Sequence, residues 1–415
     1  MRKIKMLQCA DCGKEHDFDD NDYDCTSCGG NLHVIYNYNL LKKRVTYREL
    51  ENNRNRSIWR YMDFLPLSSG KKLPVPEVGF TPLYRSEVIA ERLGIESLHI
   101  KDEGRNPSAS LKDRASAVVV ARALELGHKI VTTASTGNAA SSLACVAAGT
   151  GIKTIIFVPK TAPAPKIAQL LVFGATVIMV DGSYDDAFDL CVQASQEYGW
   201  YNRSTGYNPL TREGKKTCAY EICQQLDWEA PDKVVVPVGD GNIISGLWKG
   251  FIDFHKMGFI EKLPKLVAVQ AEHSDAVKKA FEGDGEIKPV SGKTIADSIS
   301  VSLPRDGVSA VMSIKDSQGA AVSVSDREIL NAVGELGRET GVFAEPAAAA
   351  AFAGLKKAVK EGKIEDGDTV TIIITGNGLK DINSAMKATG KPHLIKPEIG
   401  ALKELVGKHN LANGG

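Results

Sequence analysis

The chain lacks a net charge, because its 415 residues contain 51 basic and 51 acidic side chains. No overall field draws it to nucleic acid or to an anionic membrane, so any site for a polyanion must be local. No apolar run approaches the roughly 20 residues that a membrane-spanning helix needs. The polar first 20 residues also lack the apolar core of a signal peptide. We therefore expect a cytoplasmic protein that has neither nucleic acid nor a membrane as a partner.

Cysteine is scarce outside the first 28 residues, where four of the eight cysteines lie. The other four are scattered singly: Cys145, Cys191, Cys218 and Cys223. They are flanked mainly by apolar residues, so we interpret them as small buried side chains without chemistry of their own.

Two CxxC pairs, in CADCG and CTSCG, are separated by twelve residues. This spacing is typical of a zinc ribbon, in which four thiolates close a tetrahedral site with no open position. Disulfides are the alternative, but a reducing cytosol disfavours them. The acidic linker HDFDDNDYD disfavours a nucleic-acid finger. We predict a structural Zn²⁺ held by Cys9, Cys12, Cys25 and Cys28.

Short β-branched runs alternate with amphipathic stretches from about residue 95 onward; HKIVTTAS, KTIIFVP and TVTIIITG are examples. The runs lack strict polar–apolar alternation, which indicates strands that are covered on both faces. An α/β fold with open, mostly parallel sheets follows.

The segment NPSASLKDRAS places Lys112 at the predicted start of a helix. Ser108 and Ser110 are candidate caps. The positive end of a helix dipole disfavours an ammonium group, which keeps the amine available for imine chemistry. An ordinary surface lysine beside Asp113 is the alternative when this segment is considered alone.

The segment VVVPVGDGNIISG delivers an apolar strand into Gly239, Asp240, Gly241 and Asn242, and a helix is predicted to begin near Ile243. Glycines let the backbone wrap an oxyanion, which the free N–H groups of a helix start then bind. The spacing is not that of a dinucleotide fingerprint and GKS or GKT is absent, so phosphate is favoured over a nucleotide. A plain strand-to-helix turn is the alternative.

Two further segments end predicted strands with polar groups. In ASTGNAASS, the hydroxyls of Ser135 and Thr136 suit a carboxylate, and the amide of Asn138 can donate to a phenolate oxygen. In IIITGNGLKD, the hydroxyl of Thr375 can bond a ring nitrogen. Without a ligand, these would be a capped helix and a strand-end turn.

Together and in this order, the four segments resemble the fold-type II pyridoxal-phosphate enzymes, the tryptophan synthase β-like group. The resemblance covers nearly the whole chain and includes GFTPL, KDEGRNPSASLKDR, VDGSYDDA, TIADSISVSLPR and TGNGLKD. Within the group, the chain is most similar to the threonine synthases that carry an N-terminal zinc ribbon.

The resemblance implies a role for each matched residue. Lys112 would be the Schiff-base lysine and the acid/base for the α-proton, and Asn138 would meet the 3-hydroxyl oxygen of the cofactor. Thr375 would meet the pyridine nitrogen. The cofactor phosphate would lie on the loop of Gly239, Asp240, Gly241, Asn242 and Ile243. The substrate carboxylate would lie on Ser135, Thr136 and Ala139.

The segment NPLTREG departs from the family pattern, because Thr211 stands where the family usually has an arginine for the substrate phosphate. Arg212 is displaced by one position, so the phosphate would be held by Arg212, by Arg203 or by neither. Lys101, Lys215 and Lys216 are other basic candidates, interpreted as solvated charges. The phosphate loop is also one residue shorter than usual, and Asp240 would repel phosphate unless its carboxylate points away.

The implied reaction is that of threonine synthase, in which O-phosphohomoserine and water give threonine and phosphate. A cysteate synthase-like replacement on O-phosphoserine, a serine/threonine dehydratase-type ammonia-lyase and a noncatalytic regulator are the alternatives. The resemblance also implies a homodimer. We expect a ribbon (1–37), a large cofactor-binding domain (41–116 and 205–390), a small substrate domain (117–204) and a C-terminal tail (391–415).

Overall fold

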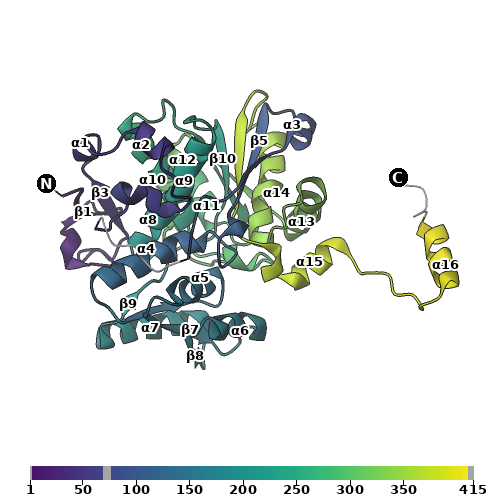
Figure 1. Ribbon diagram of the computed structural model, residues 1–415, viewed down its shortest axis with the longest axis horizontal. Coiled ribbons are helices and arrows are strands. Elements are labelled where there is room, and N and C mark those ends of the chain that lie inside the picture. Colours follow the sequence, from purple (N-terminus) through teal and green to yellow (C-terminus); the bar gives the residue numbers. More distant parts are fainter. Residues whose placement is uncertain (1, 69–75, 410–415) are drawn as a thin grey trace.

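The computed structural model describes residues 2–68 and 76–409 and contains three sheets (Figure 1). The N-terminal sheet is antiparallel, in the order β2-β1-β3. Its strands are β1 (Ile4–Cys9), β2 (Glu15–His16) and β3 (Leu32–Tyr36). The first cysteine pair starts at Cys9, the last residue of β1, and ends in the turn that follows, and the second pair lies in the turn before β3, as the ribbon prediction requires.

The largest sheet has the order β12-β11-β10-β13-β5-β4. Its strands are β4 (Leu83–Arg85), β5 (Ser97–Asp102), β10 (Lys233–Pro237), β11 (Lys265–Ala271), β12 (Ala320–Val324) and β13 (Thr369–Ile374). All neighbours pair in parallel except β4, which runs antiparallel to β5 on the edge. Val234 and Val236 pack into one apolar cluster and Val235 into another, so both faces are buried and the strand has no polar alternation.

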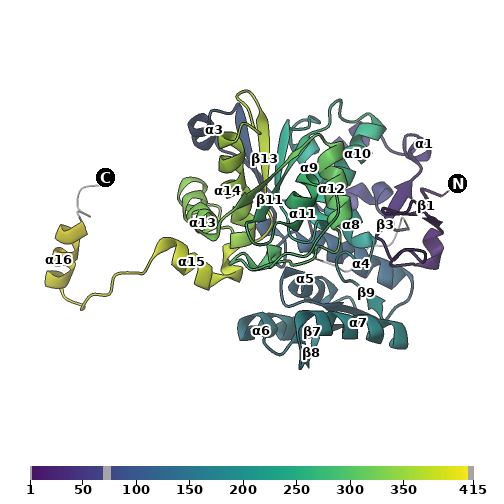
Figure 2. The same cartoon turned by 180° about the vertical axis from the view of Figure 1, so that it is seen from behind.

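Helices cover both faces of this sheet (Figures 1 and 2). α3 (Glu87–Leu93), α13 (Asp326–Thr340) and α14 (Pro346–Lys360) lie with the cluster that contains Val235. On the other face are α8 (Leu210–Lys215), α9 (Thr217–Gln225), α10 (Asn242–Met257), α11 (Ala276–Glu282) and α12 (Gly307–Asp316). The short α1 (Tyr38–Leu41) and α2 (Tyr47–Glu51) lead from the ribbon onto this side.

The third sheet is parallel, in the order β8-β7-β6-β9. Its strands are β6 (Ile130–Ala134), β7 (Lys153–Pro159), β8 (Thr176–Val180) and β9 (Tyr201–Asn202). α5 (Asn138–Ala147) and α6 (Ala164–Val172) pack on one face, and α7 (Tyr184–Tyr198) packs on the other. The prediction of an α/β fold with two mostly parallel sheets is confirmed.

Helix α4 (Lys112–Glu125) joins the two parallel sheets, because it packs against α8 on one side and α5 on the other. A buried ion-pair network fastens its first turn: Arg114 donates to Glu103 at 2.7 Å and to Glu221 at 2.6 Å. The boundary predicted at residue 117 falls inside this helix. These ion pairs therefore fix the position of the first turn of α4, which includes Lys112.

The last elements are α15 (Ile382–Thr389) and α16 (Ile399–His409). An extended arm carries α16 away from the body of the molecule, and none of its residues is buried (Figures 1 and 2). Across residues 2–68 and 76–409, no helix is both long and apolar enough to cross a bilayer.

Candidate active site

A cavity of about 790 Å³ lies between the two parallel sheets, within the size range of small-molecule sites. Residues at the carboxyl ends of β6, β10 and β13 line it, where parallel α/β folds place their ligands. It brings together eleven residues that the sequence singled out: Lys112, Ser135, Thr136, Asn138, Ala139, Gly239, Asp240, Gly241, Asn242, Ile243 and Thr375.

Backbone hydrogen bonds fix Lys112 relative to Thr375. The N–H of Leu111 donates to the carbonyl of Thr375 at 2.9 Å, and Asn377 N–H donates to the carbonyl of Ala109 at 3.0 Å. The loop before Lys112 needs a left-handed residue, since Ala109 has a φ of 63°. These hydrogen bonds therefore join the two segments where Lys112 and Thr375 line the cavity.

The predicted serine caps of α4 were wrong, because no side chain caps this helix. Asp113 instead accepts hydrogen bonds from the backbone N–H of Ser108, at 2.6 Å, and from the hydroxyl of the same serine. The prediction that Lys112 lies in the first turn is confirmed, since α4 begins at this residue.

The environment of Lys112 favours the neutral amine. Burial, and then the guanidinium of Arg203, lower the pKa of the Lys112 amine to about 8, while Glu345 and Asp240 oppose the shift. A lysine with this pKa is about one-tenth neutral at pH 7, roughly 300-fold more than a lysine of ordinary pKa. The amine is therefore suited to attack a carbonyl or to carry a proton.

The start of α10 forms a tight cradle that has room only for glycine. A Cβ on Gly241 would lie 2.4 Å from the carbonyl oxygen of Asp306, and this residue has a φ of 93°. A Cβ on Gly239 would lie 2.8 Å from the Cα of Ile299. No side chain caps α10, so its first N–H groups are available to an anion. A phosphate fits these donors.

The carboxylate of Asp240 has an internal partner, because its Oδ1 accepts a hydrogen bond from the Arg305 N–H at 2.7 Å. Burial raises the pKa of Asp240. The hydrogen bond from Arg305 weakens the expected repulsion of phosphate.

Asn138 and Ser135 stand at the start of α5 on the opposite wall. The amide of Asn138 donates to Glu345 Oε1 at 2.7 Å and to the Ser298 hydroxyl at 3.2 Å. Ser135 Oγ accepts from the Gly137 N–H at 3.2 Å. Burial raises the pKa of Glu345, so this carboxyl is more easily protonated than an exposed one.

The residues present fit pyridoxal phosphate. The glycine cradle and the free N–H groups of α10 suit its phosphate, and the partly neutral amine of Lys112 suits its aldehyde. Thr375 and Asn138 offer uncharged polar groups for the edges of the ring. The donor set matches the three chemically distinct parts of this cofactor.

Arg212 and Arg203 do not line this cavity among the residues that the structure describes. Arg212 pairs with Asp306 at 2.5 Å and donates to the Leu32 carbonyl at 3.1 Å, so it joins α8 to α12 and to the ribbon. The guanidinium of Arg203 donates to the carbonyl of Lys112 at 3.5 Å and to the hydroxyls of Ser116, at 3.0 Å, and Thr205, at 2.8 Å. This geometry does not support the prediction that either arginine holds the substrate phosphate.

Glu345 and Lys215 are among the lining residues that were not assigned to the cavity from the sequence. The sequence analysis did not single out Glu345, although the Glu-Pro pair before an alanine-rich segment was a signal that could have found it. Lys215 was interpreted as a solvated charge, yet its side chain is completely buried and lines the cavity. Its position four residues after Thr211, on the same face of a helix, was the available signal.

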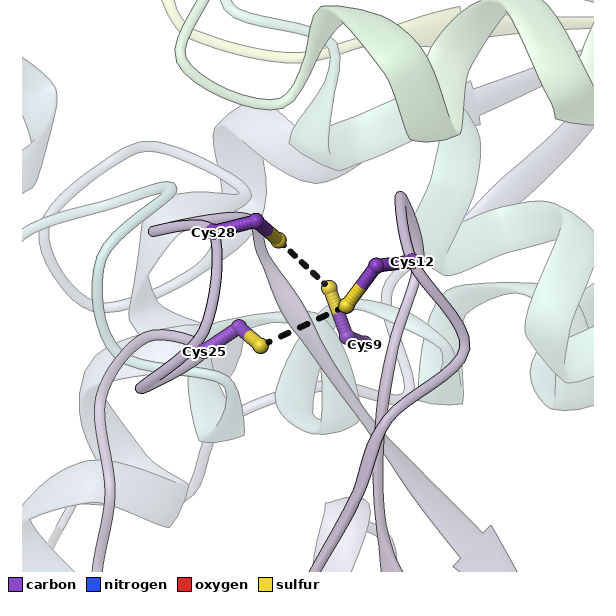
Figure 3. A group of neighbouring side chains, drawn as sticks. All are labelled: Cys9, Cys12, Cys25 and Cys28. Carbon is purple, nitrogen blue, oxygen red and sulfur yellow. Dashed lines mark hydrogen bonds between the residues drawn. The ribbon is translucent and has the colours of Figure 1, made fainter.

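The four N-terminal thiols converge on one point (Figure 3). All four sulfur atoms lie within 4.8 Å of one another, with 3.5 Å between Cys9 and Cys28 and 3.6 Å between Cys12 and Cys25. Zinc–sulfur bonds of about 2.3 Å in a tetrahedron put sulfurs nearly 4 Å apart, so the cluster fits a four-thiolate zinc site. The four scattered cysteines are all buried, as predicted.

Comparisons with known proteins show the family of the chain. The family model "Pyridoxal-phosphate dependent enzyme" matches residues 75–376. Threonine synthase from Methanocaldococcus jannaschii is 41% identical over 405 residues, covering 97% of this chain and 99% of the relative. Threonine synthase from Mycobacterium tuberculosis is 37% identical over 329 residues, covering 79% of this chain and 89% of the relative.

Solved structures share the fold. Maize serine racemase superposes with a TM-score of 0.64 at 22% identity, covering 80% of this chain and 93% of that structure. Diaminopropionate ammonia lyase from Escherichia coli has a TM-score of 0.65 at 18% identity, covering 81% of this chain and 93% of that structure. The chain therefore belongs to the pyridoxal-phosphate dependent enzyme family, in the branch of the threonine synthases.

Proposed function

We propose that the protein converts O-phosphohomoserine and water to threonine and phosphate with pyridoxal phosphate as cofactor. The observation that carries the proposal is the cavity in which Lys112, the glycine cradle and Thr375 meet. The identity to threonine synthases over nearly the whole chain supports the choice of substrate. The structural neighbours fall below 25% identity, so they bear on the fold alone.

Each residue has a proposed role toward the cofactor. Lys112 would form the covalent link, and the N–H groups at Gly241, Asn242 and Ile243 would hold the phosphate. Thr375 would face the ring nitrogen and Asn138 the phenolic oxygen. Bound pyridoxal phosphate supplies an electron sink for negative charge at the α- and β-carbons of the substrate.

The remaining steps belong to the side chains. Ser135, Thr136 and the backbone at Ala139 would bind the carboxylate and fix the substrate in one orientation. The Lys112 amine would remove the α-proton and return a proton later, because a pKa of about 8 allows both directions near neutral pH. Loss of phosphate from the γ-carbon and addition of water at the β-carbon complete the reaction.

The test compares substrates on the purified holoprotein. Release of phosphate together with threonine from O-phosphohomoserine is expected, and Lys112→Ala should abolish both this reaction and the visible absorbance of the lysine-bound cofactor. Cysteate from O-phosphoserine plus sulfite, or 2-oxobutanoate or pyruvate as the main product, would replace the proposal with one of the alternative reactions. Protein without any bound cofactor would refute it entirely.

We propose that the small domain, over residues 117–204, closes on the substrate and that the large domain comprises 41–116 and 205–390. The loop Ser135–Asn138 belongs to the smaller sheet and lies across the cavity from α10, which supports relative movement. Crystals with and without a substrate analogue should place this loop differently. Identical positions would contradict closure.

We also propose a homodimer. The arm that carries α16 supports it, because Leu394 is 99% exposed and Ile399 is 69% exposed on a segment that leaves the body. Sedimentation should give about twice the chain mass of 44.6 kDa, and a monomer at micromolar concentration would contradict it. The cytoplasmic location stays a prediction from the sequence.

A further inference from the structure

Six basic side chains are at most 2% exposed in the described chain, and four of them have carboxylate partners. The paired ones are Lys101 with Glu221, Arg114 with Glu103 and Glu221, Arg212 with Asp306, and Lys216 with Glu213 and Asp253. Buried charges need such partners because desolvation disfavours them. The two remaining side chains, Lys215 and Arg203, have no carboxylate within ion-pair distance in residues 2–68 and 76–409.

Lys215 and Arg203 lie in the same part of the molecule as Lys112. The positive charges of Lys112 and Arg203, added to burial, hold the pKa of Lys215 well below its usual value. Three basic groups therefore converge here, and the carboxylates of Asp240 and Asp306 only partly offset their charge. A fold keeps such a cluster at a cost to its own stability, which is typical of a site that receives an anion.

The amino group of Lys215 is aimed at the start of α10. It donates a hydrogen bond to Asn242 Oδ1, and Thr211 Oγ1 approaches the same oxygen at 3.3 Å. Thr211 and Lys215 are one helical turn apart on α8, so both project from one face. Asn242 is the first residue of α10, whose opening N–H groups have no side-chain cap. An anion at this helix start would meet both the N–H groups and the ammonium.

We propose that Lys215 binds a phosphate monoester dianion in the cavity, at the start of α10. Two such groups enter the site if the proposed function holds: the phosphate of the cofactor and the phosphate of the substrate. Both groups are phosphate monoester dianions. Binding either one would supply the negative charge that Lys215 and Arg203 lack among their ion-pair partners. Lys215 would also supply the cation that is absent at Thr211.

The first experiment separates the two phosphates in Lys215→Gln, which keeps a donor to Asn242 but has no charge. Calorimetric titration of the apoprotein with pyridoxal phosphate and with pyridoxal measures the contribution of the cofactor phosphate. Titration of the holoprotein with inorganic phosphate measures the contribution at the site of the substrate phosphate. A hydrogen bond to a charged group corresponds to about 10- to 150-fold in affinity.

A loss of that size for pyridoxal phosphate, but not for pyridoxal, would assign Lys215 to the cofactor. A similar loss for inorganic phosphate, with cofactor affinity unchanged, would assign it to the substrate. Lys215→Arg should retain most of the affinity in either case. Changes below about threefold in all titrations would overturn the proposal.

The second experiment separates this role from a structural one. Lys215→Gln and Lys215→Met should raise the melting temperature of the apoprotein, because each removes a buried amine that has no carboxylate partner. The neighbouring Lys216→Met should lower it, because Glu213 and Asp253 lose their partner. Unfolded or less stable Lys215 variants would overturn the proposal.

The phosphate titrations do not depend on turnover. If the holoprotein binds inorganic phosphate through Lys215 but forms no threonine, the proposed reaction fails and the anion site stands. If threonine forms and Lys215→Gln binds every phosphate normally, the anion site fails and the reaction stands.

Discussion

At the scale of single residues, the reactivity of Lys112 is set by its neighbours. The positive charge of Arg203 disfavours protonation of the amine, whereas the carboxylates of Glu345 and Asp240 favour it. The outcome is a pKa of about 8, below that of an exposed lysine. Removing the positive charge of Arg203 should therefore raise the pKa of Lys112, and removing the negative charge of Glu345 should lower it.

The rate of covalent capture of pyridoxal phosphate by the apoprotein should follow that pKa. The neutral amine is the nucleophile, so the rate should rise with pH and level off above about 8. Arg203→Met should shift the midpoint upward, because a positive charge is lost. Glu345→Gln should shift it downward, because a negative charge is lost. Stopped-flow absorbance over pH 6 to 10 gives each midpoint, and shifts of the same sign would contradict this electrostatic account.

The role of a residue could be predicted from the sequence where that role depends on its position at the end of a strand or the start of a helix. The four segments around Lys112, Asn138, Gly241 and Thr375 carry local signals, since each places a polar or glycine residue where a strand ends or a helix begins. Burial of a charge leaves no such signal. Lys215 and Lys216 are adjacent and chemically identical, yet only the fold gives carboxylate partners to one and the cavity to the other.

At the scale of elements, the cradle at the start of α10 depends on a backbone that a side chain would displace. Gly241→Ala should weaken binding of pyridoxal phosphate at least tenfold, because its Cβ would press on the Asp306 carbonyl that borders the cradle. Gly258→Ala is the matched control. It ends the same helix with a φ of 77°, and a Cβ there meets nothing within 4 Å.

Both alanine variants should lose about 1–2 kcal/mol of stability from the left-handed backbone alone. Only Gly241→Ala should lose cofactor affinity, measured by fluorescence titration of the apoprotein. Equal affinity in the two variants would show that the glycine serves the turn and not the ligand.

Arg212 joins α8 to α12 through Asp306. Arg212→Leu should cost about 3–5 kcal/mol of unfolding free energy, because Asp306 would remain buried without its partner. The double variant with Asp306→Asn should recover part of this loss in urea denaturation. If Arg212→Leu instead kept its stability and lost affinity for inorganic phosphate, Arg212 would be the phosphate ligand that its sequence position indicated.

Elements were predicted better than their ends. The strands β6, β7, β10 and β13 follow from β-branched runs that are buried on both faces, and burial of both faces removes polar alternation. The cap of α4 was predicted wrongly because Ser108 donates to Asp113, inside the helix, instead of accepting from it. Such a choice depends on the left-handed turn at Ala109, which no propensity of alanine indicates.

At the scale of the whole molecule, the ribbon is fastened to the helix that carries Lys215. Tyr36 in β3 donates to Glu213 in α8 at 2.7 Å, and Arg212 in the same helix donates to the Leu32 carbonyl. On the side of the small sheet, the Asn202 N–H donates to the Tyr23 hydroxyl at 2.9 Å. The ribbon thus contacts α8, which packs on the large sheet, and β9 of the small sheet, a long-range arrangement that its sequence spacing could not reveal.

Removal of zinc should therefore affect the cavity as well as the ribbon. We expect about one zinc per chain by metal analysis, since the four thiolates suit one ion. Chelation, or Cys9→Ser, should lower the melting temperature because the small core of the ribbon depends on the metal for its folding free energy. It should also weaken phosphate binding, because α8 loses the contacts of Tyr36 and Leu32.

Cys145→Ser, a buried cysteine outside the ribbon, is the control and should keep both the zinc and phosphate affinity. Complete removal of zinc with an unchanged melting temperature would contradict a structural metal, and a lowered melting temperature with unchanged phosphate binding would show that the ribbon stabilises the chain without supporting the site.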